Sequence, residues 1–276
     1  PALTAERCSF WHFRIDADTA MKMRALVGFM ATQPGLRKVY LLNQNYAHGQ
    51  QFSRYFREEA ARQLPDMEIV GDELHPLFQD VDFRPHVRRM RESGAQALVT
   101  GNWGADMRDL VKALQDEDLR IPLFAYYPGL KGTPRLLARH GDRLPVYQVA
   151  YNHSNQEGPV GELAEAFRRR HGEDLVVYAA YDGMVMLSQA MAFTGSTDPR
   201  LVAPRLSGMI FPGFNGPVQV RADDHQLQKG LYISRWQPVD QRYPRDAEGT
   251  GYTFAPVRFI PGADLATPVR CQMQRT

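Results

Sequence analysis

The sequence predicts an α/β fold, because short apolar runs alternate with amphipathic segments throughout its first half. The apolar runs have the length of buried strands, and the amphipathic segments repeat apolar residues at helical spacing. Between Ser9 and Val149 this alternation is regular, which is typical of a mainly parallel sheet with helices on both faces. The second half differs, because helical segments follow one another there before further strand-like runs appear.

The predicted elements of the first half begin with a strand at Cys8–Ile15. A helix follows it, with Asp16 or Asp18 as the N-cap and an apolar face that consists of Ala20, Met23, Leu26, Val27 and Met30. The later elements alternate in chain order: strand Lys38–Asn43, helix Gly49–Leu64, strand Glu68–Leu74, helix Phe83–Ser93, strand Ala97–Thr100, helix Asp106–Gln115 and strand Ile121–Tyr126.

The second half is predicted to contain one strand, consecutive helices and then more strands. In chain order these are strand Pro145–Tyr151, helices Glu157–His171 and Leu175–Phe193, a helix with Asp198 as cap and Pro199 in its first turn, and strands Gly208–Phe211, Pro217–Arg221 and Leu231–Gln237. Turns rich in Gly, Pro and Asp separate the last strands. These strands are too few for a doubly wound sheet of their own, so the second half looks like part of a domain.

Composition and charge exclude several classes of protein. The 276 residues carry a net charge of +2, and Lys and Arg are scattered among the acids without a basic stripe, which argues against a nucleic-acid partner. The apolar runs are far shorter than the roughly 20 residues of a membrane helix, so we expect no membrane span. Pro1–Arg14 has no signal-peptide pattern, and we expect that processing or truncation removed what came before it.

The two cysteines, Cys8 and Cys271, lie near opposite ends of the chain. Neither belongs to a CxxC motif or has a histidine cluster beside it, so a zinc site is not expected. Two interpretations stay open. The cysteines are either buried free thiols or one disulfide that joins the C-terminal tail to the first strand, and a disulfide requires an oxidising compartment.

Enzyme signatures are absent from the sequence: it has no GxSxG elbow, no HExxH, no phosphate-binding loop and no GxGxxG after the first strand. The eight histidines are dispersed, and we expect neither a metal nor a cofactor. Asp223-Asp224-His225 is the densest polar triplet, and we interpret it as a solvated turn between two strands rather than as a metal or acid/base site. The sequence therefore favours a protein that is not an enzyme.

Aromatic and small polar residues follow three of the predicted strands. In an open α/β sheet, ligands bind in the crevice beyond the carboxyl ends of the strands, where these loops would lie. The residues expected to contact a ligand there are Tyr46, Asn102, Trp103, Tyr126 and Tyr127. An alternative is that the rings only cap the core. No loop pairs a nucleophile with a base, so binding is favoured over catalysis.

These loops, together with several other segments, resemble type I periplasmic binding proteins of the leucine/isoleucine/valine-binding family. The resemblance is collinear over nearly the whole chain, and no single motif decides it. Its segments are Lys38–Leu42 with Tyr46-Ala47-His48-Gly49-Gln50, Phe83-Arg84-Pro85, Ser93-Gly94-Ala95, Val99–Gly104, Gly195–Pro199, Asn215–Val218, Asp223–Gln226 and Glu248–Tyr252.

The resemblance implies two doubly wound α/β lobes that are joined by a hinge and hold a ligand between them. It further implies that about a hundred residues, signal peptide included, precede Pro1 in the complete protein, which leaves the first lobe incomplete. Residues 1–15 would then be a remnant of the first lobe and a crossing, and residues 16–146 the complete second lobe. Residues 147–214 would return to the first lobe, and residues 215–276 would form the last crossing and the tail.

The family resemblance also implies a function. The protein would be the periplasmic substrate-binding component of an ABC importer, with a membrane permease and an ATPase as partners. In the family an acid binds the ligand's ammonium group, yet Phe124–Lys131, where that acid should fall, contains none. Amino acids and related small carboxylates, amides and aromatic acids are therefore all candidate ligands. The alternative is a ligand-sensing domain of the same fold in a receptor or regulator.

Overall fold

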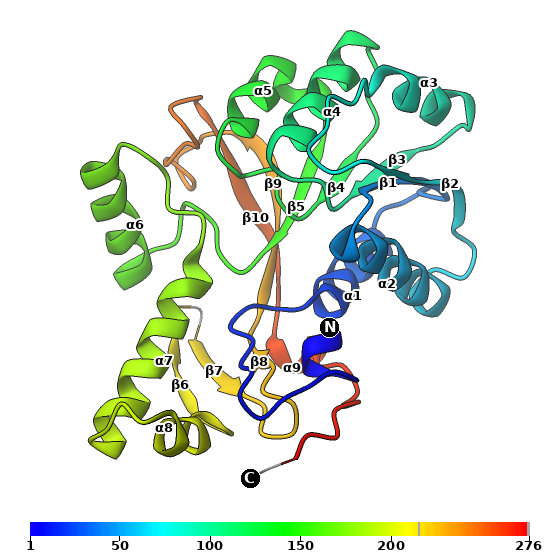
Figure 1. Cartoon of the computed structure of the whole chain (residues 1–276). Helices are drawn as coiled ribbons and strands as arrows, with labels where there is room; N and C mark the ends of the chain where they lie inside the picture. Colours follow the sequence, from blue (N-terminus) through cyan, green and yellow to red (C-terminus); the bar gives the residue numbers. More distant parts are fainter. Residues whose placement is uncertain (215, 275–276) are drawn as a thin grey trace. The chain divides into compact units, whose positions relative to one another are not determined.

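The chain forms two compact units in a computed structural model that describes residues 1–214 and 216–274 (Figure 1). Unit 1 consists of the described residues within Pro1–Lys22, Val177–Leu231 and Ile260–Thr276, and unit 2 of Met23–Val176 and Tyr232–Phe259. Residues 147–176 therefore group with unit 2. The four segments expected from the family resemblance stay a proposal about the complete protein, and two of their ends, Asn215 and Thr276, lie outside the described residues.

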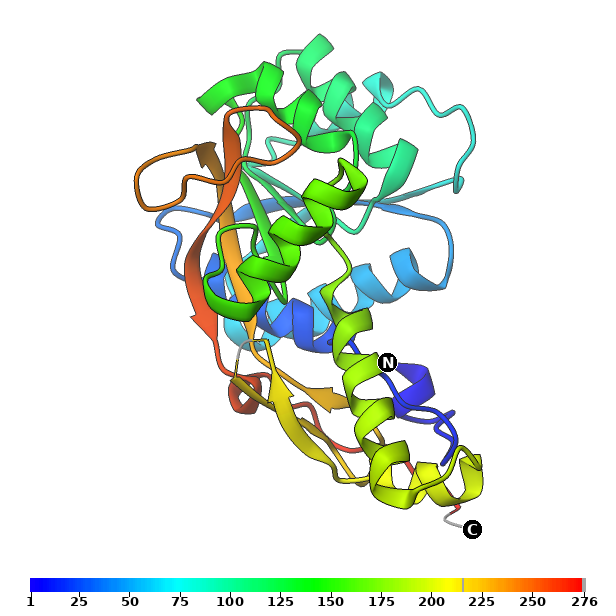
Figure 2. The same ribbon diagram turned by 90° about the vertical axis from the view of Figure 1, so that its left-hand side faces the viewer.

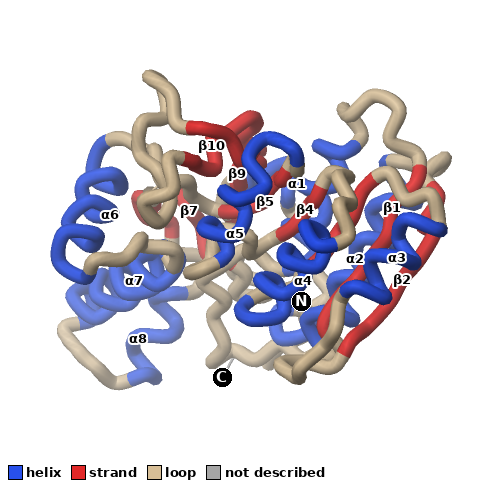
Figure 3. Tube along the Cα trace, turned by 90° about the horizontal axis from the view of Figure 1, so that it is seen from above, coloured by secondary structure: helices blue, strands red, loops and turns tan. Residues whose placement is uncertain are grey.

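Unit 2 is built on a mixed sheet with the strand order β10-β9-β5-β4-β3-β1-β2. Its strands are β1 (Lys38–Gln44), β2 (Glu68–His75), β3 (Ala97–Thr100), β4 (Leu123–Ala125), β5 (Val146–Ala150), β9 (Leu231–Pro238) and β10 (Tyr252–Ile260). Pairing is parallel from β2 to β5 and antiparallel between β5 and β9. Figure 3 shows β1 and β2 at one end of the sheet and β9 and β10 towards the other.

Helices cover both faces of this sheet, which explains why β3 and β4 are buried along their whole length. The helices on these faces are α1 (Thr19–Met30), α2 (Ala47–Gln63), α3 (Arg84–Glu92), α4 (Gly104–Asp116) and α5 (Thr133–His140), and α6 (Gly158–His171) follows β5 in the same unit. Leu98, Leu123 and Val146 share one apolar core with α3, α4 and α5. On the other face, Phe29 of α1 lies 5.2 Å from Tyr147 of β5, measured between ring centroids. Figure 1 shows these two layers.

Unit 1 combines two packed helices with a small antiparallel sheet. Its elements are a 3-10 turn at Ala2–Thr4, α7 (Tyr178–Thr194), α8 (Pro199–Leu206), β6 (Ile210–Gly213), β7 (Gly216–Val220), β8 (Leu227–Gln228) and α9 (Gly262–Leu265). Met186 and Ala190 of α7 share a core with Phe211 and Val218 of the sheet. Figure 2 shows the yellow strands beside the yellow-green helix α7.

A buried ion cluster joins the separate segments of unit 1. The Lys229 side chain is fully buried, and its Nζ donates a hydrogen bond to the Ile15 carbonyl at 3.0 Å. The same Nζ lies 3.2 Å from Asp16 Oδ1 and 3.8 Å from Asp182 Oδ2 of α7. Burial lowers the pKa of Lys229, and the two carboxylates act in the opposite direction. Because removal of one partner would leave a buried charge uncompensated, the cluster ties residues 15–16 to α7.

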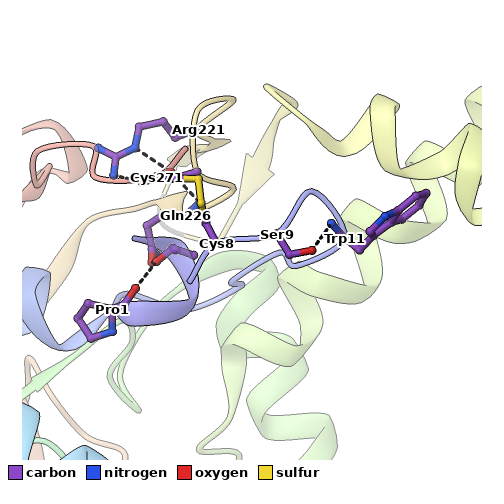
Figure 4. The surroundings of a disulfide bond; sticks show 9 residues. Pro1, Cys8, Ser9, Trp11, Arg221, Gln226 and Cys271 are labelled. Atoms are coloured by element: carbon purple, nitrogen blue, oxygen red, sulfur yellow. Dashed lines mark hydrogen bonds and ion pairs between the residues drawn. A yellow bond between two sulfur atoms is a disulfide. The ribbon is translucent and has the colours of Figure 1, made fainter. Parts of the chain in front are cut away.

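A disulfide joins the two ends of the described chain in unit 1 (Figure 4). Cys8 and Cys271 are bonded, with their Cα atoms 5.6 Å apart. The tail is also held by Arg221, whose Nη1 donates to the Thr267 carbonyl at 2.7 Å. The structure therefore contains the disulfide, which was one of the two interpretations of the cysteines, and not two free thiols.

Most predicted elements are confirmed, with ends that differ by a few residues. Asp18 caps α1 by accepting from the Met21 amide at 2.9 Å, and Asp198 caps α8 by accepting from the Arg200 amide at 2.9 Å. The helix expected from Leu175 begins three residues later, at Tyr178. The sequence patterns did not predict α5, β8 or β10.

Two predictions are wrong. Cys8–Ile15 is not a strand: Phe10 and Trp11 lie in a turn, and of these eight residues only Arg14 forms a bridge, with Gln226. Its Phe13 ring instead stacks on the His225 imidazole at 4.1 Å between centroids. The turn at 223–225 is also not solvated as a whole. Asp224 and His225 are 2% and 1% exposed, because Arg221 pairs with Asp224 and aromatic rings cover His225.

Replacing both Cys8 and Cys271 by Ser is predicted to lower the free energy of unfolding by about 2–4 kcal/mol, because the bond closes a long loop in the unfolded chain. Urea unfolding of both proteins measures the difference. Reductant should destabilise the original protein and leave the double variant unchanged. Equal midpoints without reductant would contradict a stabilising bond.

Acid is predicted to destabilise unit 2 through His153. Burial lowers its pKa to about 4, so the folded protein keeps the imidazole neutral where the unfolded chain binds a proton. Because the unfolded state then binds more protons, stability falls as the pH drops from about 6.5 towards 4. His153→Gln should flatten the dependence of the urea midpoint between about pH 7 and about pH 4.5. The same change at His171, which is exposed, is the control, and equal slopes in all three proteins would refute the assignment.

Candidate ligand-binding site

The loops after β1, β3 and β4 lie at one edge of the unit 2 sheet, because parallel strands bring their carboxyl ends together. Tyr46 is the N-cap residue of α2 and Trp103 that of α4, both with extended backbone. Neither side chain caps its own helix, so both rings are available for contacts between loops. Tyr126 and Tyr127 follow β4 directly.

A hydrogen bond links the first two loops. The Trp103 indole Nε1 donates to the Tyr46 hydroxyl oxygen at 2.7 Å, and both rings are half-buried. Burial raises the pKa of the Tyr46 phenol, the bond from Trp103 acts against this, and Tyr127 and Asp106 add to the rise. The Tyr46 hydroxyl therefore stays protonated at neutral pH and is a neutral polar group at this edge.

His48 lies among the aromatic rings, and the sequence patterns did not single it out. Its imidazole centroid is 5.7 Å from that of Tyr46 and 5.9 Å from those of Tyr126 and Tyr127. Its Nε2 is 3.2 Å from the Gly101 carbonyl oxygen, which ties the β1 loop to the β3 loop. Phe52, four residues further along α2, packs against Tyr126 at 4.8 Å. Residues four positions apart lie on the same face of a helix, and this spacing is the sequence feature that could have placed His48 beside Phe52.

The expected site residues differ in their accessibility. Tyr127 is half-buried, whereas Tyr126 is only 2% exposed. Asn102 is fully buried, and its Oδ1 lies 3.1 Å from Nε2 of His75 at the end of β2. Tyr46, Trp103, Tyr126 and Tyr127 thus form one cluster with His48 and Phe52, which we call the aromatic cluster. Asn102 contacts His75 instead and is not part of it.

Side-chain hydrogen bonds hold the β1 and β3 loops together beyond the strands. The Asn43 amide oxygen accepts from the Gly101 backbone N–H at 2.7 Å, and its nitrogen donates to Ser53 Oγ at 3.1 Å. Thr100 Oγ1 donates to the Leu42 carbonyl at 2.6 Å. Gly101 permits this approach, because a Cβ there would lie 2.6 Å from the Phe52 ring. The loops that carry the rings are therefore fixed by buried polar contacts.

One buried carboxylate stands behind the aromatic cluster. Asp106, in the first turn of α4, is 2% exposed, and its Oδ2 accepts from Gln44 Nε2 at 2.6 Å. The same oxygen accepts from the backbone N–H of Phe78, in the loop between β2 and α3, at 3.2 Å. The sequence patterns did not indicate Asp106 or Phe78 as part of a site, because the two residues are 28 positions apart in the chain. Phe124–Lys131 itself contains no acid.

Within 1–214 and 216–274, no group of three or more His, Cys, Asp and Glu side chains is arranged to hold a metal ion. None of the helices described for this chain is both long enough and apolar enough to cross a membrane.

Known proteins resemble this chain in sequence. A family model described as periplasmic binding protein matches residues 1–242. The Leu/Ile/Val-binding protein homolog 4 of Brucella abortus is 25% identical over 286 residues, and the match covers 99% of this chain and 66% of that protein. The Brucella suis protein of the same name matches equally well. The chain thus spans slightly less than two thirds of the length of these curated relatives.

Solved structures resemble it in fold. The leucine-, isoleucine-, valine-, threonine- and alanine-binding protein of Brucella ovis, in a closed conformation, has a TM-score of 0.86 at 23% identity, covering 100% of this chain and 71% of that one. A solute-binding protein of an ABC transporter from Rhodopseudomonas palustris, in complex with 3,4-dihydroxybenzoic acid, has a TM-score of 0.75 at 20% identity, covering 91% and 67%. At these identities the likeness establishes the fold.

Proposed function

The chain belongs to the periplasmic binding protein family, and on this basis we propose that it is the substrate-binding component of an ABC importer. It captures an amino acid or a related small carboxylate, amide or aromatic acid, held between two lobes as in the family resemblance. Its further partners are the permease and the ATPase of that importer, and it works in the periplasm.

The aromatic cluster carries this proposal. Rings from three βα loops gather at the carboxyl edge of the unit 2 sheet, where open α/β sheets bind ligands. Pockets for small molecules are mainly lined by apolar and aromatic side chains with a few polar groups that set orientation. Here the polar groups are the Tyr46 hydroxyl and the His48 imidazole. Tyr46, Trp103 and Tyr127, being half-buried, are the residues that contact the ligand, and Tyr126 supports them from below.

The chemistry of the cluster favours binding without transformation. The Trp103 indole donates to the Tyr46 hydroxyl, the His48 ring lies beside that of Tyr46, and His48 Nε2 faces the Gly101 carbonyl oxygen. Asp106, the carboxylate behind the rings, already accepts two hydrogen bonds from the protein. A ligand would therefore meet mainly aromatic rings on this wall, with the buried Asp106 carboxylate behind them. That suits an uncharged or planar part of an amino acid or aromatic acid.

Ligand is predicted to raise the thermal stability of the complete natural protein. A panel of amino acids, aromatic acids and their amides should contain at least one compound that raises Tm, because a ligand at a hundred times its Kd stabilises by about 2.7 kcal/mol. Differential scanning fluorimetry measures the shift, and nucleotides serve as controls that should have no effect. A flat response of folded protein over the whole panel would refute the proposal.

Trp103→Ala is predicted to raise the Kd for the compound identified in this way more than about tenfold, which corresponds to about 1.4 kcal/mol. The variant loses both the indole surface and the hydrogen bond to Tyr46. Calorimetry measures the affinity, and circular dichroism checks that the variant is folded. Trp11→Ala is the matched control, since Trp11 is half-exposed in unit 1 and outside the cluster. An unchanged Kd in folded Trp103→Ala would remove that loop from the site.

A further inference from the structure

Phe78 combines two features that a packing residue seldom has. It lies in the loop between β2 and α3 with its side chain 51% exposed, and its φ angle is +50°. Positive φ is unfavourable for a bulky residue, and the backbone keeps it only where its surroundings enforce it. Neither burial of the ring nor backbone preference accounts for a phenylalanine in this conformation.

Three contacts enforce the position of Phe78. Its backbone N–H donates to Asp106 Oδ2 at 3.2 Å, and Asp106 is itself fixed by Gln44 at 2.6 Å. Its ring meets the Trp103 indole edge to face, with centroids 4.7 Å apart and planes at 85°. It also lies over Gly104, where a Cβ would be 3.3 Å from Phe78 Cε1. The ring is therefore held directly against the Trp103 loop of the aromatic cluster.

Strained backbone that is held in place beside a binding site is a mark of function more often than of stability. The Phe78 ring enlarges the aromatic surface that begins with Tyr46 and Trp103, and it does so at the exposed margin where a ligand's side chain can reach it. Aromatic rings prefer edge-to-face and offset stacked neighbours, which a planar ligand can supply and a branched aliphatic chain cannot.

We propose that Phe78 is a specificity-determining residue that selects ligands with a planar aromatic ring over aliphatic ligands of similar size, and that Asp106 is the positioning residue that holds it against Trp103. This inference rests on the proposed function, because it requires that the aromatic cluster bind a small molecule.

Two matched pairs of probes test the selectivity in the complete natural protein: benzoate against cyclohexanecarboxylate, and phenylalanine against leucine. Within each pair the head group is similar and the ring or chain differs. The quantity measured by calorimetry is the ratio of the two Kd values in a pair. We expect the wild-type protein to prefer the aromatic member of at least one pair.

Phe78→Asn removes the ring and keeps the loop, because asparagine tolerates positive φ. It should raise the Kd for the preferred aromatic probe about three- to tenfold and change the Kd for its aliphatic partner less than twofold. Phe78→Tyr keeps a ring at the same place and should retain the wild-type ratio. An equal change for both probes of a pair, or no change for either, would overturn the assignment of Phe78.

Asp106→Ala should weaken the preference for the aromatic probe over its aliphatic partner, because it removes the hydrogen bond that holds the Phe78 backbone in place. Added to Phe78→Asn it should cause no further loss of selectivity, since both changes remove one and the same interaction. Asp106→Asn keeps an oxygen that accepts from the Phe78 N–H and should restore most of the preference. Additive losses in the double variant would show that Asp106 does not act through Phe78.

The outcomes separate this inference from the proposed function. Wild-type protein that binds none of a broad panel refutes both. If the wild-type protein binds a ligand and Phe78→Asn shows the same ratio of Kd values for the two probes of a pair, only the role of Phe78 is refuted. Wild-type protein that binds only aliphatic probes also refutes that role and leaves the importer function standing.

Discussion

Parallel pairing of β2, β1, β3, β4 and β5 is the constraint on which the rest of unit 2 depends. Each connection between these five strands must cross a face of the sheet and return, so helices cover both faces and all five strands end at the same edge. Tyr46, Trp103 and Tyr126 are far apart in the chain and close in space for this reason alone. The pairing also explains why β3 and β4 are buried throughout, since neither of their faces meets water.

Beyond the ends of the strands, hydrogen bonds from side chains, and not strand pairing, hold the loops together. Asn43 bonds to the Gly101 N–H, Thr100 bonds to the Leu42 carbonyl, and Asp106 receives both Gln44 and the Phe78 N–H. These groups are buried, so leaving any of them unpaired would cost about 1–3 kcal/mol. The loops that carry the rings are consequently rigid parts of the fold. A surface fixed in this way can bind a ligand without first paying the entropy of ordering itself.

Features encoded by neighbouring residues were predictable from the sequence, and features that need distant partners were not. Periodicity identified the β1 to α4 alternation, and local signals gave Asp198 as one cap and Asp16 or Asp18 as the other, of which Asp18 caps α1, because these signals lie within one turn or one strand. Cys8–Ile15 has the composition of a strand, yet a strand needs an edge to pair with, and only Gln226 offers one. In the same way the patterns pointed to the tyrosines and Trp103, which the structure brings together, but not to Asp106 and Phe78, which are linked by a hydrogen bond across 28 residues.

The placement of charge in the proposed site decides what kind of selectivity it can have. The buried Asp106 carboxylate accepts hydrogen bonds from Gln44 and from the Phe78 N–H behind the rings, so this wall offers a ligand rings instead of a directly exposed partner for an ion pair. A buried ion pair would discriminate by charge, at the cost of desolvating both partners. A wall of rings discriminates by shape and planarity, through contacts that are individually weak and depend on the angle between rings. Residues that set those angles, and not residues that carry charge, are therefore the ones through which this protein would come to prefer one ligand over another.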